Sequence, residues 1–442
     1  VALVAVAVAG GACVVHAGAC AAARLGGGVE VRRYGSEAGA LRGFEAHLLD
    51  LDPDVVLSFD NRALGLLGER FETVVGRRPR LARGKRDSAG WRVKSVTTYS
   101  KDWIKSRSEG GRRMASSNNL ETHRLDGVEG RACLDLLRFV SMRATPKLTR
   151  YTLAEASRAL LDAAPPTVGP AARAGLAAPR RAALAAAEAR TVLALAAATN
   201  CVAETFETAR ATGLDLDTVS WRAASVRSEQ LLLRASRSFG AALPLKRPAP
   251  VMRTPWAADT TPFLYHPSPL AELQPHQVNL VESGLMGHGG GTAGFYEDPV
   301  VVLDFASLYP SVFIAHNVCY TTLASSDGAR AHETPTTRPG DRELWGFVGA
   351  DARDGLVPRT LRALLRARKA AKAGARAAAA AGDRRLADCL DARQLSLKMC
   401  ANATYGYTGS DVSSLEGKPL AELSLIHISE PTRQEAISYA VF

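Results

Sequence analysis

Two long helical segments that follow each other directly constrain the fold of this chain more than any other feature. Residues 356–381 and 384–403 have helical composition, and only Gly382 and one aspartate separate them. Glycine favours the end of a helix because it adopts left-handed backbone angles at little cost. Consecutive helices with so short a connection lie antiparallel, so the sequence predicts an antiparallel helix pair.

Positive charge is concentrated on this pair. The chain has 442 residues and a net charge of +11, from 55 Lys and Arg against 44 Asp and Glu. Residues 356–398 contain 11 basic and 3 acidic residues, so this short segment carries +8 of the net charge. A basic balance indicates a polyanionic partner, a nucleic acid or a membrane surface, while a solvated helix face is the simpler alternative. On the second segment, offsets of four and seven residues place Lys398, Asn402 and Tyr405 on one stripe.

Strand and helix patterns alternate at the start of the chain. Val and Ala alternate over residues 4–8, and Gly10, Gly11 and His16 interrupt the apolar sequence, which favours two strands, the second at residues 13–16, over a membrane span. Residues 37–51 have helical spacing, and residues 55–59 indicate a buried strand. This alternation predicts an α/β first domain. Apolar residues make up 47% of the chain, enough for packed cores, which excludes a disordered protein.

Other segments are less informative. Residues 77–119 are basic and contain Ser and Gly, which predicts an insertion or an exposed loop, and the Ala-rich residues 154–210 favour helix. Residues 243–275 are rich in proline, as at a domain boundary. The seven cysteines show no Cys-x₂-Cys spacing. We therefore expect an intracellular, reducing setting, with neither a disulfide framework nor a zinc site.

A carboxylate follows the strand predicted for residues 299–303. Asp304 opens the octet DFASLYPS at residues 304–311. A carboxylate at the end of a buried strand suits Mg²⁺, which binds oxygen ligands together with substrate phosphates; a helix cap is the common alternative. Cations from two helices near such a ligand favour a triphosphate clamp. The chain contains no Gly-x₄-Gly-Lys-Ser/Thr, which excludes a P-loop NTPase.

These residues resemble a known family. The octet at residues 304–311 resembles motif A of family B DNA polymerases, and KMCANATYG at residues 398–406 is similar to their motif B. Residues 355–358 (GLVP), with the basic helix after them, look like the start of the family's fingers. The longer stretch LDARQLSLKMCANATYGYT, residues 390–408, resembles the zeta branch, which carries out translesion synthesis. A delta-like replicative polymerase and a catalytically dead scaffold that only binds DNA are the alternatives.

The resemblance implies nucleotidyl transfer, in which a primer 3′-hydroxyl attacks the α-phosphorus of a dNTP with the help of two Mg²⁺ ions. It implies that Asp304 and the main-chain carbonyl of Phe305 bind metal. It also implies that Tyr309, together with Leu308, forms the floor under the sugar and excludes a 2′-hydroxyl. The other implied contacts to the dNTP are triphosphate contacts from Arg368, Lys372 and Lys398, and base-pair contacts from Asn402 and Tyr405.

The fold that the resemblance implies is multidomain, α/β and α+β. It comprises an RNase H-like exonuclease-type domain at residues 1–240, a partial palm with an antiparallel sheet at 241–345, two-helix fingers at 346–410 and a return to the palm at 411–422. Primer–template DNA and accessory polymerase subunits are the implied partners, without a membrane, and the implied location is the nucleus, in DNA replication and repair. An iron–sulfur cluster is left open, because its ligands would lie outside this chain.

The exonuclease motifs are eroded in this sequence. Residues 52–56 match the strand before the family's second exonuclease motif, but residues 58–64 do not place its Asn and its Phe-Asp pair at the usual positions. The Tyr and Asp of the third motif fall at Leu184 and Glu188. Without those carboxylates two metal ions cannot be held, so we expect no 3′–5′ exonuclease. Asp60, which a shifted alignment would make a ligand, is the main alternative.

The C-terminal part predicts an incomplete chain. No Asp-Thr-Asp of the family's motif C occurs, so we expect the polypeptide as written to be inactive. Residues 423–433 and 437–442 resemble a translated sequencing adapter. This resemblance predicts that residues 423–442 are a library artefact; a lineage-specific tail is the alternative.

Overall fold

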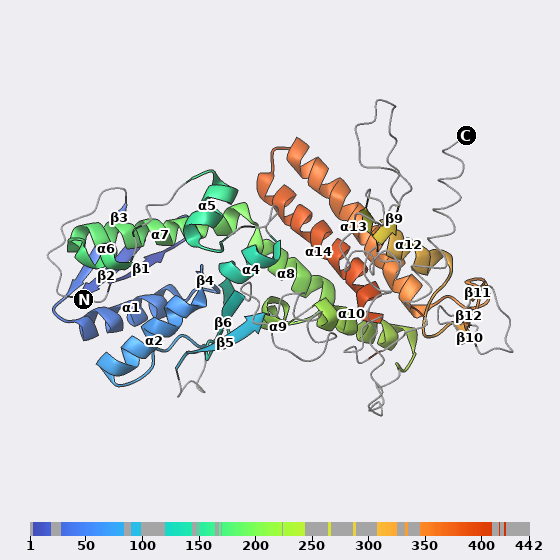
Figure 1. The fold of residues 1–442 in the computed structure, drawn as a ribbon, viewed down its shortest axis with the longest axis horizontal. Helices are drawn as coiled ribbons and strands as arrows, with labels where there is room; N and C mark the ends of the chain where they lie inside the picture. Colours follow the sequence, from blue (N-terminus) through green and yellow to red (C-terminus); the bar gives the residue numbers. More distant parts are fainter. Residues whose placement is uncertain are drawn as a thin grey trace. The chain divides into compact units, whose positions relative to one another are not determined.

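The computed structural model of the chain contains two compact units, Val1–Thr205 and Phe206–Phe442 (Figure 1). The division falls inside helix α8 (Cys201–Thr212), and the domain boundary expected at residue 240 stays a prediction. The structure describes residues 3–18, 28–83, 90–98, 120–143, 148, 150–163, 168, 170–222, 224–243, 264–266, 286–288, 307–324, 332–334, 345–408, 415 and 420.

A three-stranded sheet forms the centre of the first unit. β1 (Leu3–Ala7) pairs antiparallel with β2 (Cys13–Gly18), and β2 pairs in parallel with β3 (Val29–Tyr34). Every residue of β2 is buried, because α1 (Glu37–Leu51) and α7 (Ala178–Ala198) pack on the sheet from opposite faces (Figure 1). These layers confirm the α/β start that the sequence predicted.

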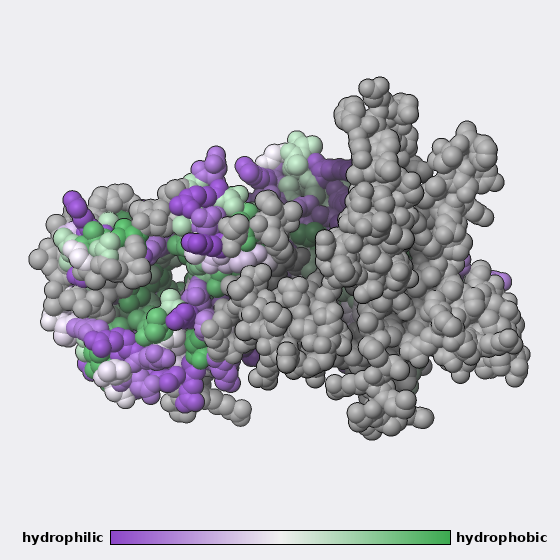
Figure 2. Space-filling view, in the orientation of Figure 1, coloured by the Kyte–Doolittle hydropathy of each residue, from purple (hydrophilic) through white to green (hydrophobic). Residues whose placement is uncertain are grey.

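Helix α1 spans the residues that its apolar spacing predicted. The hydroxyl of Ser36 accepts a hydrogen bond from the backbone N–H of Gly39 at 3.1 Å, which caps the N-terminus. Leu41 and Phe44 are buried in the core, and Asp52 ends the helix in a left-handed conformation, with φ of 41°. Hydrophilic side chains gather over the outer side of α1 and its neighbour α2 in Figure 2, as expected of an amphipathic surface helix.

Of the insertion or exposed loop predicted for residues 77–119, the exposed loop is wrong at residues 91–98, and the insertion stays a prediction. Trp91 is 2% exposed, and residues 92–98 form strand β5 (Arg92–Thr98). Some of the arginines in this range have acidic partners close by in space. Arg77 forms an ion pair with the buried carboxylate of Glu45 on α1, at 2.6 Å. Composition alone does not reveal such a pairing between residues 32 positions apart.

Short strands and a run of helices complete the first unit and continue into the second. β4 (Val55–Ser58) pairs in parallel with β7 (Ala132–Asp135), and β5 pairs antiparallel with β6 (Leu120–Asp126). The helices predicted from the Ala-rich sequence are present. They are α5 (Leu153–Leu161), α6 (Pro170–Gly175), α7 and α8, accompanied by α2 (Asn61–Val75), α4 (Leu136–Arg143), α9 (Leu216–Trp221) and α10 (Ala224–Phe239).

No single helix among the described residues is long and apolar enough to cross a membrane. The bent pair of α7 and α8 passes that test by length and composition only.

The second unit contains two small sheets. β10 (Leu323–Ala324), β12 (Trp345–Phe347) and β11 (His332–Thr334) form an antiparallel sheet in that order. β8 (Leu264–His266) and β9 (Met286–His288) form a parallel pair. The chain therefore has a mixed α/β fold in which the described sheets are small.

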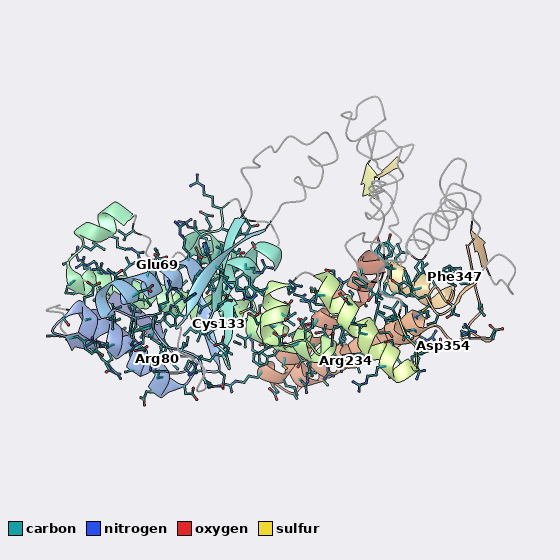
Figure 3. The ribbon with its side chains drawn as sticks, turned by 90° about the horizontal axis from the view of Figure 1, so that it is seen from below. Glu69, Arg80, Cys133, Arg234, Phe347 and Asp354 are labelled. Atoms are coloured by element: carbon teal, nitrogen blue, oxygen red, sulfur yellow. The ribbon has the colours of Figure 1, made fainter. Side chains whose placement is uncertain are left out.

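The predicted antiparallel helix pair is present in the second unit. α13 (Leu356–Ala380) and α14 (Arg384–Thr408) lie side by side in Figure 1. Gly382 connects them with φ of 78°, a conformation that favours glycine. α14 extends five residues beyond the predicted end at 403. Both helices share a core with α12 (Leu308–Ala315) and with β12, whose Phe347 is fully buried at one end of this unit (Figure 3).

Candidate functional site

Two tyrosines from separate elements stack on each other in the second unit. Tyr309 lies at the start of α12 and Tyr405 near the end of α14. Their ring centroids are 4.2 Å apart and their planes differ by 6°. Tyr309 is half-buried, and this burial raises the pKa of its phenol. The hydroxyl therefore stays protonated at neutral pH and adds no charge to the site.

A third aromatic ring fixes Tyr405 from another side. Phe313 lies one turn after Tyr309 on α12 and meets the ring of Tyr405 edge to face, at 6.4 Å between centroids. Tyr405 is 5% exposed and Phe313 is 1% exposed. An aromatic pair of either geometry contributes about 0.5–1.5 kcal/mol beyond the burial of its area. The ring of Tyr309 therefore rests on a rigid support.

The stripe predicted on α14 passes from solvent into the core. Lys398 and Asn402 are exposed, whereas Tyr405 is buried. The reason is that the C-terminal part of α14 packs against α12, while the middle of this face of the helix does not. The structure thus gives Lys398 and Asn402 an environment different from that of Tyr405, although helical spacing treats the three alike.

The cations of α13 have different surroundings. Arg368 is half-buried and its Nε–H donates to Oε1 of Gln394 on α14, at 3.4 Å. Lys372 is exposed one turn further along the helix. Among the described residues, neither Lys372 nor Lys398 forms an ion pair. Both ammonium groups are therefore available for an anionic ligand.

Two other cations of α13 are occupied. Arg359 lies over the ring of Phe239 on α10, 5.7 Å from the centroid. Arg362 forms an ion pair with Asp354, just before the helix, and Asp354 lies at the same end of the unit as Phe347 in Figure 3. Arg359 thus contacts α10 and Arg362 the segment just before α13, so the basic run on α13 does not act as one surface.

The predicted metal ligands Asp304 and Phe305 lie outside the described residues. Leu308, the first residue of α12, is half-buried beside Tyr309. Within the part of the chain that the structure describes, no group of three or more His, Cys, Asp or Glu side chains has the arrangement of a metal site.

The two carboxylates considered for an exonuclease site, Asp60 and Glu188, have partners in the first unit. Asp60 caps α2 by accepting from the backbone N–H of Arg62, at 2.8 Å, and its Oδ1 lies 3.2 Å from Nδ1 of His123. Glu188 on α7 forms an ion pair with Arg173. Leu184, at the position of the family's tyrosine, is buried on the same helix.

The sequence pattern did not single out Asp135, at the end of β7. It is 5% exposed, and it accepts from the backbone N–H groups of Arg138 at 3.2 Å and Asn61 at 3.4 Å. Burial raises the pKa of its carboxyl to about 6. An aspartate directly after the apolar residues 132–134 was the available signal, the same signal that drew attention to Asp304.

Comparison with known proteins connects the second unit to one family. Residues 289–426 match the sequence model of DNA polymerase family B. The chain is 40% identical over 165 residues to the DNA polymerase delta catalytic subunit of Oryza sativa subsp. japonica, and 45% identical over 136 residues to that of Dictyostelium discoideum. These matches cover 34% and 30% of this chain but only 14% and 11% of the relatives. The matched region is therefore a small part of their length.

A solved structure extends the likeness to most of the chain. The family B DNA polymerase of the archaeon Pyrobaculum calidifontis is similar with a TM-score of 0.60, over 92% of this chain and 46% of that one, at 21% identity. The chain therefore has the fold of family B DNA polymerases. The stacked tyrosines and the free cations of α13 and α14 all lie inside the matched residues 289–426.

Proposed function

We propose that this chain is part of a DNA-directed DNA polymerase of family B, which adds dNTPs to a primer 3′-hydroxyl. One observation supports this function most. Inside the family-matched residues, Tyr405 stacks on Tyr309 and shares helix α14 with the exposed Lys398, while Lys372 is exposed on the paired helix α13. Neither lysine has an ion-pair partner among the described residues. An aromatic floor suits a sugar and a base, and free cations suit phosphates.

Each predicted residue has a role in this proposal. The ring of Tyr309 closes the space under the sugar, and its stack on Tyr405 keeps it from turning away from a 2′-hydroxyl. Leu308 shapes the same floor. Arg368, Lys372 and Lys398 hold the triphosphate, and Asn402 and Tyr405 line the nascent base pair.

The proposal includes divalent metal ions, and the support for them comes from the sequence motif at residues 304–311. Asp304 and the carbonyl of Phe305 would hold one of two Mg²⁺ ions, which when bound stabilise charge on the entering and leaving oxygens. The described residues contribute binding and orientation of the nucleotide.

The zeta branch remains our preferred assignment within the family. Residues 390–408 resemble it, and the engagement of Asp60 and Glu188 with other side chains supports the absence of 3′–5′ exonuclease activity. The curated relatives named above are delta catalytic subunits, so a replicative delta-like enzyme is the second candidate. Accessory subunits, a nuclear location and translesion synthesis belong to this proposal.

Primer extension tests the function directly. The protein that carries this chain is assayed on a primer–template with all four dNTPs, with and without Asp304→Ala. We expect the substitution to abolish extension while DNA affinity stays within about twofold, since one carboxylate of the metal site is lost and phosphate contacts remain. Extension retained by Asp304→Ala contradicts the polymerase assignment. In the same assay, removal of a mismatched 3′ nucleotide favours the delta-like candidate.

A further inference from the structure

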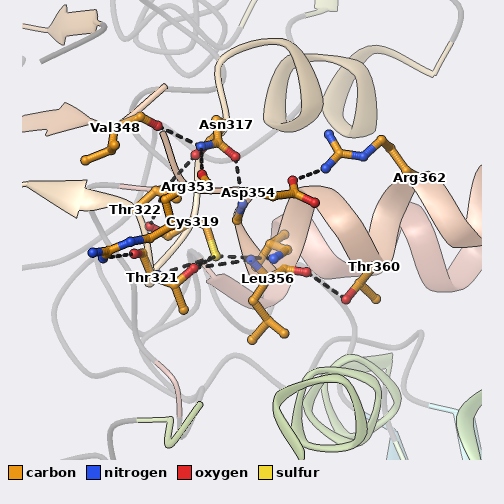
Figure 4. Close-up of polar contacts among 12 residues, drawn as sticks. Asn317, Cys319, Thr321, Thr322, Val348, Arg353, Asp354, Leu356, Thr360 and Arg362 are labelled. Atoms are coloured by element: carbon orange, nitrogen blue, oxygen red, sulfur yellow. Dashed lines mark hydrogen bonds and ion pairs between the residues drawn. The ribbon is translucent and has the colours of Figure 1, made fainter. Parts of the chain in front are cut away.

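The turn that follows α12 forms an unusual set of contacts with the start of α13. Asn317 is 2% exposed and has φ of 51°, in the left-handed region that asparagine tolerates better than most residues. Its Nδ2 donates to the carbonyls of Val348 at 2.7 Å and Arg353 at 2.8 Å (Figure 4). Its Oδ1 accepts from the backbone N–H of Gly355 at 2.9 Å. Both polar atoms of its side-chain amide are therefore hydrogen-bonded to the segment that precedes α13.

The same turn caps the first two residues of α13. The N–H groups of a helix's first turn have no partner within the helix. The N–H of Leu356 donates to Oγ1 of Thr321 at 3.2 Å, and that of Val357 donates to Sγ of Cys319 at 3.2 Å (Figure 4). With Asn317, three side chains of one turn therefore hold three successive amides.

Gly355 makes this close contact possible. A Cβ at this position would lie 2.9 Å from Oδ1 of Asn317, 2.9 Å from Cβ of Cys319 and 3.0 Å from Cδ of Pro358. No side chain fits in that space without displacing its neighbours. The first turn of α13 therefore rests directly on the turn after α12.

This turn links the two halves of the site. α12 carries Tyr309, eight residues before Asn317, and α13 carries Arg368 and Lys372. Phe313 of α12 packs in the same core as Val357. A movement of α13 relative to α12 would have to break the hydrogen bonds of the turn.

We propose that Asn317 and Thr321 are positioning residues, which fix the angle between α12 and α13 so that one nucleotide meets the tyrosine floor and the triphosphate cations together. This inference rests on the proposed polymerase function. It goes beyond it by assigning nucleotide affinity to residues that touch no nucleotide.

Amide hydrogen exchange of the whole chain tests the anchoring without any assumption about activity. Thr321→Val removes the acceptor for the N–H of Leu356. Thr360→Val is the matched control, because Thr360 is also half-buried and its hydroxyl donates to the carbonyl of the same Leu356, at 2.8 Å. We expect exchange at residues 355–357 to rise at least tenfold in Thr321→Val and less than twofold in Thr360→Val. Equal protection in both variants overturns the anchoring.

Steady-state primer extension tests the positioning role. Asn317→Asp keeps the acceptor for Gly355 but loses both donors to the carbonyls of Val348 and Arg353. We expect Asn317→Asp and Thr321→Val to raise the KM for dNTP about tenfold, with DNA affinity and the KM of Thr360→Val changed less than twofold. An unchanged KM alongside faster exchange overturns the coupling. A parent protein that extends no primer contradicts the proposed function, and the exchange result then decides on the anchoring alone.

Discussion

Tyr309 shows how a single residue obtains its role from a neighbour distant in sequence. Its ring is only half-buried, yet it stacks on a ring that is almost fully buried. Because Tyr405 is also held edge-on by Phe313, rotation of Tyr309 would cost the stacking energy. Exclusion of a 2′-hydroxyl by the ring of Tyr309 depends on such rigidity, since a ring that turns aside would leave room for a ribonucleotide.

Replacement of Tyr309 tests this exclusion. Tyr309→Ala removes the ring, and we expect ribonucleotide incorporation relative to dNTP incorporation to rise at least ~10-fold, within the range for loss of a shaped contact. Tyr309→Phe keeps the ring and its stack, so its sugar selectivity stays near that of the parent. Competition assays with paired rNTP and dNTP measure both ratios. Selectivity that is unchanged in Tyr309→Ala removes the gate role.

His16 gives the first unit a measurable pH dependence. It is fully buried in β2, with its ring nitrogens 3.0 Å from the hydroxyl of Tyr34 and 2.9 Å from Nδ1 of His47. Burial and the nearby His47 lower the pKa of His16 from 6.5 to about 4. The folded state then resists a proton that the unfolded state accepts, so stability is full above about pH 6.5 and falls as the pH drops toward 4.

Chemical denaturation at pH 7 and pH 5 checks this sign. We expect the titration of His16 to lower the free energy of unfolding by about 2 kcal/mol from pH 7 to pH 5, so His16→Asn loses less stability on acidification than the parent.

Asp135 should act in the opposite direction, because its pKa is raised to about 6 and protonation relieves a buried charge as the pH falls. Asp135→Asn is therefore expected to lose about 1 kcal/mol more than the parent. The same slope in all three proteins contradicts both assignments.

At the scale of the element, the cations of helix α13 lie on different faces and have different surroundings. Arg368 points toward α14, where it contacts Gln394, whereas Arg366 is exposed. Positions two apart on a helix are separated by about 200° around its axis. The two arginines have the same chemistry and nearly the same place in the sequence, yet only one faces the second helix.

This difference makes a matched pair of variants. We expect Arg368→Ala to raise the KM for dNTP between about 10- and 100-fold, because a hydrogen bond to a charged group contributes about 1.5–3 kcal/mol. Arg366→Ala should change it less than about twofold, as for a solvated charge. Steady-state extension with a single correct dNTP measures both. A similar loss in the two variants would indicate a general effect of helix charge instead of a specific contact.

At the scale of the whole molecule, charge and fold are distributed unequally. The first unit is an α/β arrangement whose acidic residues pair with many of its arginines. The helix pair of the second unit carries +8 of the net +11. The first unit, residues 1–205, contains 30 basic and 20 acidic residues, so the helix pair is one of two positively charged regions that would attract a polyanion such as DNA.

Salt dependence tests whether this attraction involves phosphate contacts. If the protein neutralises about four phosphates, its affinity for duplex primer–template falls about 100-fold between about 50 and about 200 mM salt. Fluorescence anisotropy with a labelled duplex measures the slope, and an analogue with an uncharged backbone serves as the control. An affinity for DNA that is independent of salt contradicts a phosphate-based interface.

The sequence determined the parts that depend on neighbouring residues. The limits of α1 and the glycine break between α13 and α14 follow from spacing and backbone preference. The apolar run of β2 followed in the same way. The octet at residues 304–311 and the stripe on α14 identified the candidate site by residue type alone. Local propensity is sufficient for these features, because each is formed within a few residues.

Tertiary structure alone decided which of these residues meet. Tyr309 and Tyr405 are 96 positions apart and stack only because α12 packs against α14. Arg77 is exposed, but its ion-pair partner Glu45 lies on another element, 32 positions away. The three amides held by the turn after α12 likewise have partners more than 30 residues away. Such contacts follow from the packing of whole elements, and a linear pattern does not encode which faces will be pressed together.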